Sequence, residues 1–120
     1  MIDYAEILDQ AHAAARDAVA KATKEFDEMK GACGFAWVTI PGNDALARFC
    51  RRQLKAFQTD QVRAQHAQRY GDKGYPVGWQ FWNPGNHPGQ RIDIKEAGAR
   101  AFRDALATHG IRADVGSRLD

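Results

Sequence analysis

Apolar residues in the first thirty positions recur at alternating steps of four and three, the spacing of a narrow stripe along one helix. The segment is rich in alanine and has neither glycine nor proline before Gly31, so it predicts one helix over residues 1–30. The stripe consists of Leu8, His12, Ala15, Val19, Ala22, Phe26 and Met29. A stripe of this length requires a cover, which is either the domain's own sheet or a second copy of the chain in a homodimer.

Short strands and amphipathic helices follow Gly31. Residues 35–40 are mainly aromatic or β-branched, with apolar side chains on both faces, which predicts a central strand. Over residues 44–57 the apolar positions share one helical face and basic residues occupy the rest, which predicts an amphipathic helix with a cationic outer surface. Residues 59–70 are polar, and the threonine or the aspartate at their start is suited to cap a helix N-terminus. They predict a short exposed helix that stops at Gly71.

The segment 72–89 predicts a turn, a strand and a stiff loop. Residues 72–74 have turn chemistry, and an alternating strand follows them up to Trp82. The core side of this strand is predicted to consist of Val77, Trp79 and Phe81. Trp82 is then on the opposite, exposed face. Residues 75–89 also contain three of the four prolines, and prolines and aromatic rings lose little entropy on binding, so this segment is a candidate recognition surface.

The last third of the chain predicts a helix and a strand. Asp93, with Glu96 three residues later, is typical of a capping box that begins a helix, and Gly110 is placed to end it in a left-handed conformation. Residues 111–119 alternate apolar and polar, which predicts a strand with one face in water. The inward side of the helix is predicted to consist of Ile94, Ala97, Ala101, Ala105 and Leu106.

This order of elements predicts one α+β domain over residues 1–120, with the helix 1–30 preceding an α/β core over 33–120. We expect a small sheet of three to four strands with helices mainly on one face. The turn Pro-Gly-Asn follows a strand twice, at 41–43 and 84–86, which would suit a ferredoxin-like arrangement of two β-α units. Pro-Gly-Asn is a common turn sequence, however, and chance explains its repetition better than a duplicated unit does.

Composition and charge indicate an ordinary globular domain with an uneven distribution of charge. The 120 residues are 44% hydrophobic and 27% charged, and neither a secretory leader nor an apolar run of about 18 residues is present, so we expect a cytoplasmic protein. Cys33 and Cys50 match no disulfide or metal spacing and are predicted to be buried thiols, and no cofactor or metal is expected. Residues 1–30 hold seven acidic and four basic residues, whereas 48–73 hold seven basic and two acidic ones. The basic segment attracts an anionic partner, unless it pairs with the acidic helix.

These features favour a small binding protein for a phosphate-bearing ligand, either a nucleotide or a nucleic acid. Arginine side chains suit bidentate phosphate recognition, and exposed aromatic rings suit base stacking. The candidate ligand-binding residues are Arg48, Arg51, Arg52, Lys55, Arg69, Tyr75, Trp82, Asn86 and His87. Two alternatives remain open: an accessory protein or inhibitor that binds another protein through aromatic and arginine anchors, and a small hydrolase or transferase that uses His87. No catalytic motif ties His87 to a nucleophile, so the binding functions are favoured over catalysis.

Three segments carry a resemblance to a group of proteins. These are Gly-Trp-Gln-Phe-Trp-Asn-Pro-Gly at 78–85, Asp-Ile-Lys-Glu-Ala-Gly-Ala-Arg-Ala-Phe at 93–102 and Gly-Ser-Arg-Leu-Asp at 116–120. Together they resemble small uncharacterised proteins of tailed bacteriophages. The resemblance covers the last third of the chain and assigns no activity or site residue. It implies expression in a bacterial host, where binding to a host protein, to nucleic acid or to a signalling nucleotide is favoured over catalysis.

Overall fold

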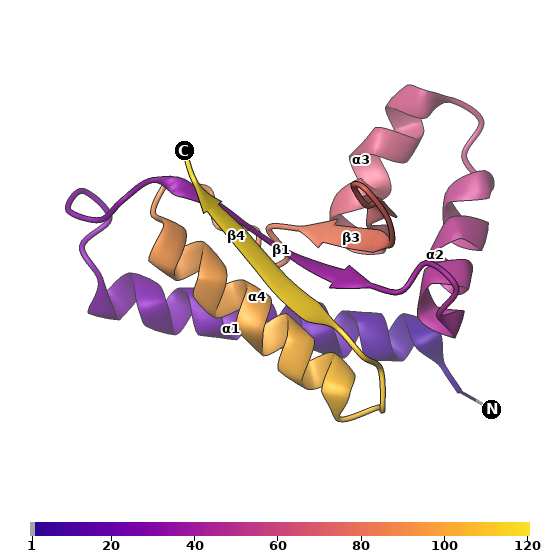
Figure 1. Cartoon of the computed structure of the whole chain (residues 1–120), viewed down its shortest axis with the longest axis horizontal. Helices are drawn as coiled ribbons and strands as arrows, with labels where there is room; N and C mark the ends of the chain where they lie inside the picture. The colour runs from indigo at the N-terminus through magenta and orange to yellow at the C-terminus, as the bar shows by residue number, and fades with distance from the viewer. Residues whose placement is uncertain (1) are drawn as a thin grey trace.

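Four helices and one four-stranded sheet form the secondary structure of residues 2–120, the part of the chain that the computed structural model describes (Figure 1). In chain order they are α1 (Tyr4–Glu25), β1 (Gly34–Ile40), α2 (Ala45–Lys55), α3 (Asp60–Tyr70), β2 (Asp72–Lys73), β3 (Trp79–Trp82), α4 (Ile92–Ala107) and β4 (Asp114–Leu119). The strands lie in the order β2-β3-β1-β4, and every neighbouring pair is antiparallel. The predicted α+β class and the four-stranded sheet are confirmed.

The chain from β1 onwards follows a ferredoxin-like arrangement. A strand, a helical crossover and a strand are followed by a second strand, helix and strand, and the two halves interleave because β1 lies between β3 and β4. The crossover between β1 and β2 consists of two short helices, α2 and α3, instead of one. α1 precedes this unit as an additional element.

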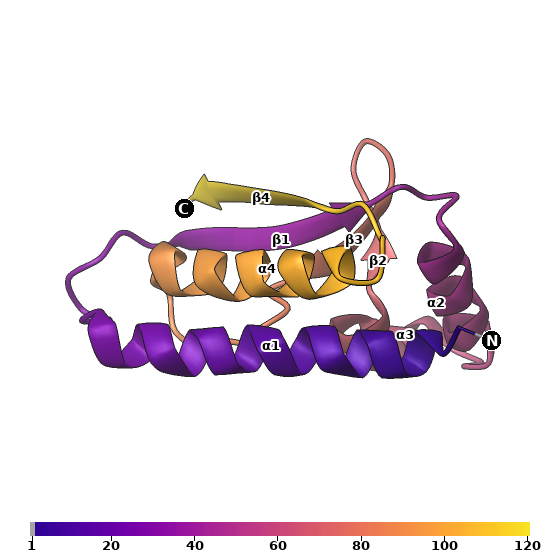
Figure 2. The same ribbon diagram turned by 90° about the horizontal axis from the view of Figure 1, so that it is seen from below.

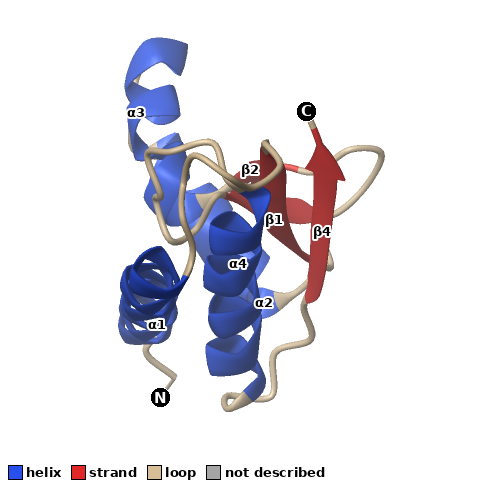
Figure 3. Cartoon of the chain, turned by 90° about the vertical axis from the view of Figure 1, so that its left-hand side faces the viewer, coloured by secondary structure: helices blue, strands red, loops and turns tan. Residues whose placement is uncertain are grey.

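The molecule has three layers, in which α4 lies between α1 and the sheet (Figures 2 and 3). Gly98 lies where α4 meets α1, and a Cβ atom there would come within 2.9 Å of Val19 Cγ2. Glycine therefore permits the close approach of the two helices. The other face of the sheet is covered by no helix among residues 2–120, in agreement with the prediction of helices on one face (Figure 2).

The predicted N-terminal helix is confirmed, but it ends at Glu25. Asp3 caps it by accepting a hydrogen bond from the Glu6 amide at 3.1 Å. The stripe is buried from Leu8 to Ala22, mostly in contact with α4, whereas its last two members, Phe26 and Met29, are exposed beyond the helix end. The stripe is thus covered inside the chain over this part of its length, and the homodimer stays a prediction.

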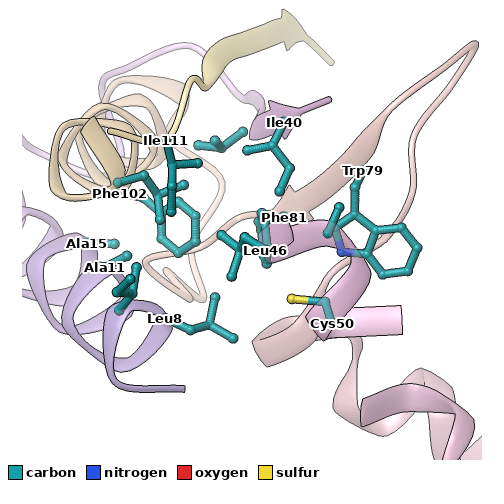
Figure 4. Packing of buried hydrophobic residues seen from close by; sticks show 14 of the residues in the cluster. Leu8, Ala11, Ala15, Ile40, Leu46, Cys50, Trp79, Phe81, Phe102 and Ile111 are labelled. Carbon is teal, nitrogen blue, oxygen red and sulfur yellow. The ribbon is translucent and has the colours of Figure 1, made fainter. Parts of the chain in front are cut away.

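The main core fills the space between the inner face of the sheet and the helices (Figure 4). Alternation in β1 directs Ala36, Val38 and Ile40 into it, as the predicted central strand requires. Its largest fully buried side chains include Phe81, Phe102, Leu8, Ile40 and Leu46. His12 of α1 joins this core, and its two ring nitrogens lie 3.1 Å from the Pro84 carbonyl oxygen and 2.9 Å from that of Arg69.

The predicted middle helices are both present, and they differ in burial. α2 buries Leu46, Ala47, Cys50 and Leu54, whereas α3 buries none of its residues. α3 begins with a cap at Thr59 and ends at Gly71, which has a positive φ of 79°. None of the helices in residues 2–120 is long and apolar enough to cross a membrane.

Four local predictions are wrong. Residues 72–73 form the edge strand β2 and not a turn, because they pair with β3. Val77 is 76% exposed, since it lies in the loop of the β2–β3 hairpin and not in the strand. Asp93 does not cap α4, because its carboxylate accepts hydrogen bonds from the Arg91 guanidinium. Cys33 is exposed and not buried, at the isolated bridge that precedes β1.

The inward face of α4 is also different from the predicted one, although Ile94 and Leu106 are buried as expected. The predicted alanines at 97, 101 and 105 are only partly buried. The helix lies between two layers, so it buries residues on two sides. Its buried residues are Ile92, Ile94, Lys95, Gly98, Ala99, Phe102 and Leu106.

Candidate functional site

The uncovered face of the sheet carries a group of partly exposed aromatic side chains on two adjacent strands. Alternation in β1 sends Phe35, Trp37 and Thr39 away from the helices. Trp82 of β3 is the register partner of Trp37, so its side chain leaves the sheet on the same side. We call this side the outer face, and we call Phe35, Trp37 and Trp82 the aromatic platform.

The ring of Trp82 contacts the other two rings of the aromatic platform. The rings of Trp37 and Trp82 are stacked, with centroids 5.2 Å apart and planes 4° apart, and the ring of Phe35 lies 5.6 Å from that of Trp82. Gly116 of β4 makes room for this arrangement, because a Cβ atom there would come within 2.5 Å of the Trp37 ring. Trp82 is still 45% exposed, so part of the stack is open to a ligand.

Two cations flank the ring of Phe35. The guanidinium carbon of Arg118 lies 5.4 Å from the ring centroid, and Lys95 Nζ lies 5.3 Å from it. Lys95 is buried and donates to the Gly34 carbonyl at 3.0 Å, whereas Arg118 is exposed on the outer face. Positive charge therefore lies at one end of the aromatic platform.

A groove opens beside Trp82, at the other end of the aromatic platform. Its volume is about 360 Å³, and β2, β3 and the C-terminal part of α3 form its walls. The residues that line it are Ala67, Gln68, Asp72, Lys73, Gln80 and Trp82. Such a volume is near the lower limit of small-molecule sites, which begin at about 300 Å³.

The predicted basic residues of α2 lie elsewhere. α2 is on the side of the sheet that carries the helices, and the outer face is on the other (Figure 2). Arg51 has a structural role there, because it donates to the Gly42 carbonyl and lies 5.5 Å from the ring centroid of the buried Trp79. Arg48, Arg52 and Lys55 are exposed. The structure thus places the exposed basic residues of α2 away from Trp82.

Arg69 and Tyr75 also have separate positions. Arg69, at the end of α3, forms an ion pair with Asp9 of α1 at 3.0 Å and lies over the Tyr70 ring. Tyr75 is 89% exposed in the β2–β3 hairpin loop, which projects beyond the sheet on the side of the outer face (Figure 2). Of the predicted residues, Tyr75 and Trp82 are therefore the two on the side of the aromatic platform.

Asn86 and His87 lie in the loop between β3 and α4. Asn86 is exposed in a turn, with a positive φ of 55°. His87 is 8% exposed, and its Nε2 atom lies 3.0 Å from a carboxylate oxygen of Glu28. The other oxygen of Glu28 accepts hydrogen bonds from the backbone amides of Gln90 and Arg91. These bonds fasten the loop to the segment after α1.

The chemistry of the thiols and of metal ligands adds no second site. Burial raises the pKa of the Cys50 thiol to about 12, which keeps it protonated and unreactive at neutral pH. Within residues 2–120, no group of three or more His, Cys, Asp or Glu side chains is arranged to hold a metal ion.

Phe35, Trp37, Lys95 and Arg118 are not among the predicted site residues. Residues 35–40 were predicted to form a central strand with apolar side chains on both faces, and no role was assigned to the face without helices. The signal was nevertheless present, since a sheet with helices on one face leaves the second apolar face of a central strand open.

Comparisons with protein-family models, with curated proteins and with solved structures found no match to this chain. Function is therefore inferred from the geometry alone.

Proposed function

We propose that this protein binds single-stranded nucleic acid on the outer face of its sheet, with bases stacked on the aromatic platform. This keeps the predicted class of ligand, a phosphate-bearing one, and assigns it to the sheet. The observation that carries the proposal is the open stack of Trp37 and Trp82 across two adjacent strands.

The physical basis is base stacking. Every base has an apolar π face, so exposed aromatic rings bind single strands with little regard to sequence, at about 1–3 kcal/mol per base. RNA-binding domains with a four-stranded sheet use aromatic rings on the open face in this way. Phe35 and Trp37 leave β1 on that face two residues apart, and Trp82 leaves β3 beside them.

Charge favours the same ligand. Arg118 is exposed beside the ring of Phe35, where it would neutralise a phosphate next to a stacked base. Tyr75 projects on the same side and is available to a longer strand. The exposed residues Arg48, Arg52 and Lys55 of α2 form a separate candidate surface for the phosphate backbone.

The test is fluorescence anisotropy of a labelled octathymidylate. We expect Trp82→Ala and Trp37→Ala each to weaken binding about 5- to 150-fold, which corresponds to the loss of one stacked base. Met29→Ala is the matched control, because Met29 is a large apolar residue that is 89% exposed outside the outer face. Circular dichroism verifies that each variant is folded.

Other outcomes point to other surfaces. If the double variant Arg48→Glu/Arg52→Glu loses binding while Trp82→Ala binds like the wild type, the binding site is on α2 and not on the sheet. If no oligonucleotide binds and light scattering shows a dimer that Trp82→Ala dissociates, the outer face is an interface between copies of the chain.

A further inference from the structure

We infer that the groove beside Trp82 holds one base of the bound strand and selects guanine. This inference rests on the proposed function, since it assigns base specificity to one end of the aromatic platform. It is carried by the groove's volume and by the side chains that converge on it.

Three side chains enter the groove from the outer face of the sheet. Asp72 of β2 is the register partner of Gln80 of β3, so both side chains leave the sheet on one face. Trp82 follows Gln80 by two residues and therefore shares that face. The three side chains form a wall with one ring, one carboxylate and one amide, all of which line the groove.

The opposite wall belongs to α3. Gln68 donates its Nε2 atom to the carbonyl oxygens of Asn83 at 3.2 Å and Pro84 at 3.4 Å. These bonds hold its side chain across the end of β3 and leave Oε1 as an acceptor. The groove thus offers a ring for stacking and a fixed set of polar groups, which is the usual composition of a selective small-ligand site.

The carboxylate of Asp72 distinguishes between the bases. Its Oδ1 atom accepts from the Lys73 amide at 2.7 Å, and each carboxylate oxygen has a second lone pair for a ligand. On their Watson–Crick edges, guanine presents two adjacent donors, N1–H and the N2 amino group. Adenine and cytosine present one donor group beside an unprotonated ring nitrogen, and thymine presents one N–H between two carbonyls.

Guanine therefore satisfies both oxygens of the carboxylate, whereas every other base places an acceptor beside it. Lys73 also borders the groove, but it is the register partner of the core-facing Trp79, so its side chain leaves the sheet on the helix side and is assigned no contact with the base. The remaining amide, Gln80, can bond the other groups of a purine.

The experiment compares four octathymidylates that carry dG, dA, dC or dT at one central position. We expect the wild type to bind the dG strand about 5- to 150-fold more tightly than the other three, the discrimination of one good bidentate contact. Asp72→Asn should remove that preference, so that the dG strand binds no more tightly than the other three. Asp114→Asn is the matched control. Asp114 is the register partner of Thr39, so its side chain projects from the outer face, but it does so on β4, away from the groove.

Equal affinity for the four strands, or a preference that survives Asp72→Asn, overturns the inference while the proposed function stands. A titration with GMP and AMP, followed by backbone NMR, tests the opposite case, in which the groove binds guanine but the strand does not bind the platform. If the octathymidylate does not bind but GMP alone shifts the amides of Asp72 and Gln80, the groove is a guanine site and the platform is not a stacking surface. If neither GMP nor any strand shifts these amides, both proposals fall.

Discussion

Trp79 and Trp82 show at the scale of single residues how one short strand serves two purposes. They are three positions apart in β3, so they leave the sheet on opposite faces, and they are 6% and 45% exposed. Trp79 donates its indole N–H to the Tyr70 carbonyl at 2.7 Å, which satisfies its polar atom inside the core. Trp82 stacks on Trp37 instead and remains open to solvent.

The Trp79→Ala variant should lose about 3–5 kcal/mol of unfolding free energy, because it removes a buried indole and leaves a cavity. Urea unfolding followed by far-UV circular dichroism measures the loss. Trp82→Ala should lose less than half as much, since the residue is 45% exposed. Equal losses in the two variants would mean that both rings belong to the core.

Glu28 makes stability depend on pH. Its pKa lies below the ordinary value of 4.5, first because the Arg91 backbone amide donates to the carboxylate, and further because His87 and the Gln90 amide do so. A carboxyl whose pKa is depressed by folding stabilises the protein above the unfolded-state pKa, and this contribution is lost as the pH falls through the folded-state pKa.

Glu28→Gln should therefore be less stable than the wild type at pH 7, and the difference should shrink as the pH falls below about 4.5. Urea unfolding at several pH values between 7 and 3 measures both effects. Glu25→Gln, an exposed position of α1, is the control. A difference that stays constant with pH would contradict an ionic role for Glu28.

Single residues were predictable where sequence spacing alone determines their environment. The contrast between Trp79 and Trp82 follows from strand alternation, and Gly110 was correctly placed at the end of α4, where its φ is +74°. The partner of His87 was not predictable, because Glu28 is 59 residues away in sequence. Arg51 was assigned to a ligand because its contacts with Gly42 and Trp79 depend on the tertiary packing of α2.

At the scale of elements, the packing of α1 on α4 depends on small residues. Gly98 faces Val19 of α1 and Gly85 of the loop after β3, and a Cβ atom on Gly98 would lie 2.9 Å from Val19 Cγ2 and 3.4 Å from Gly85 Cα. Contacts that short require the neighbouring atoms to move, and a packed interior resists such movement.

Gly98→Val should therefore destabilise the fold by about 1–3 kcal/mol, the usual range for overpacking. Thermal or urea unfolding measures it, and Ala107→Val, at an exposed position of the same helix, should change stability by no more than about 0.5 kcal/mol. Val19→Ala in the Gly98→Val background should recover part of the loss, because it removes the opposing methyl groups. Without such recovery, the close approach of α1 and α4 would not be the cause.

Most elements were predictable because their periodicity is strong. The stripe of α1, the central strand β1 and the amphipathic α2 all have the expected type and position. β2 was not predictable, since two residues carry no periodicity and the strand exists through its pairing with β3. The packing of α4 was mispredicted because one apolar stripe was expected, whereas the helix contacts both α1 and the sheet.

At the scale of the whole molecule, the two faces of the sheet separate the candidate cationic surfaces. Arg118 is exposed beside the aromatic platform, whereas Arg48, Arg52 and Lys55 lie on α2 on the other side. Single-strand affinity falls with salt at a logarithmic slope of about −0.7 for each phosphate that a cation neutralises. The slope therefore reports how many of these cations contact the ligand.

We expect a slope of about −0.7, since one exposed cation, Arg118, flanks the platform and Lys95 is buried. Anisotropy titrations of the octathymidylate at several salt concentrations measure it. Arg118→Ala should bring the slope close to zero, while Arg112→Ala, an exposed residue just before β4, should leave it unchanged. A slope steeper than about −3 would require the α2 arginines to take part.

The architecture of β1 has a consequence for how this protein can change. Its odd-numbered positions, Phe35 and Trp37, present the aromatic rings, and its even-numbered positions, Ala36 and Val38, build the core. The proposed binding face and the core thus depend on alternate positions of the same strand. Substitutions at positions 35 and 37 can therefore change the proposed binding face and leave the core side chains of β1 unchanged.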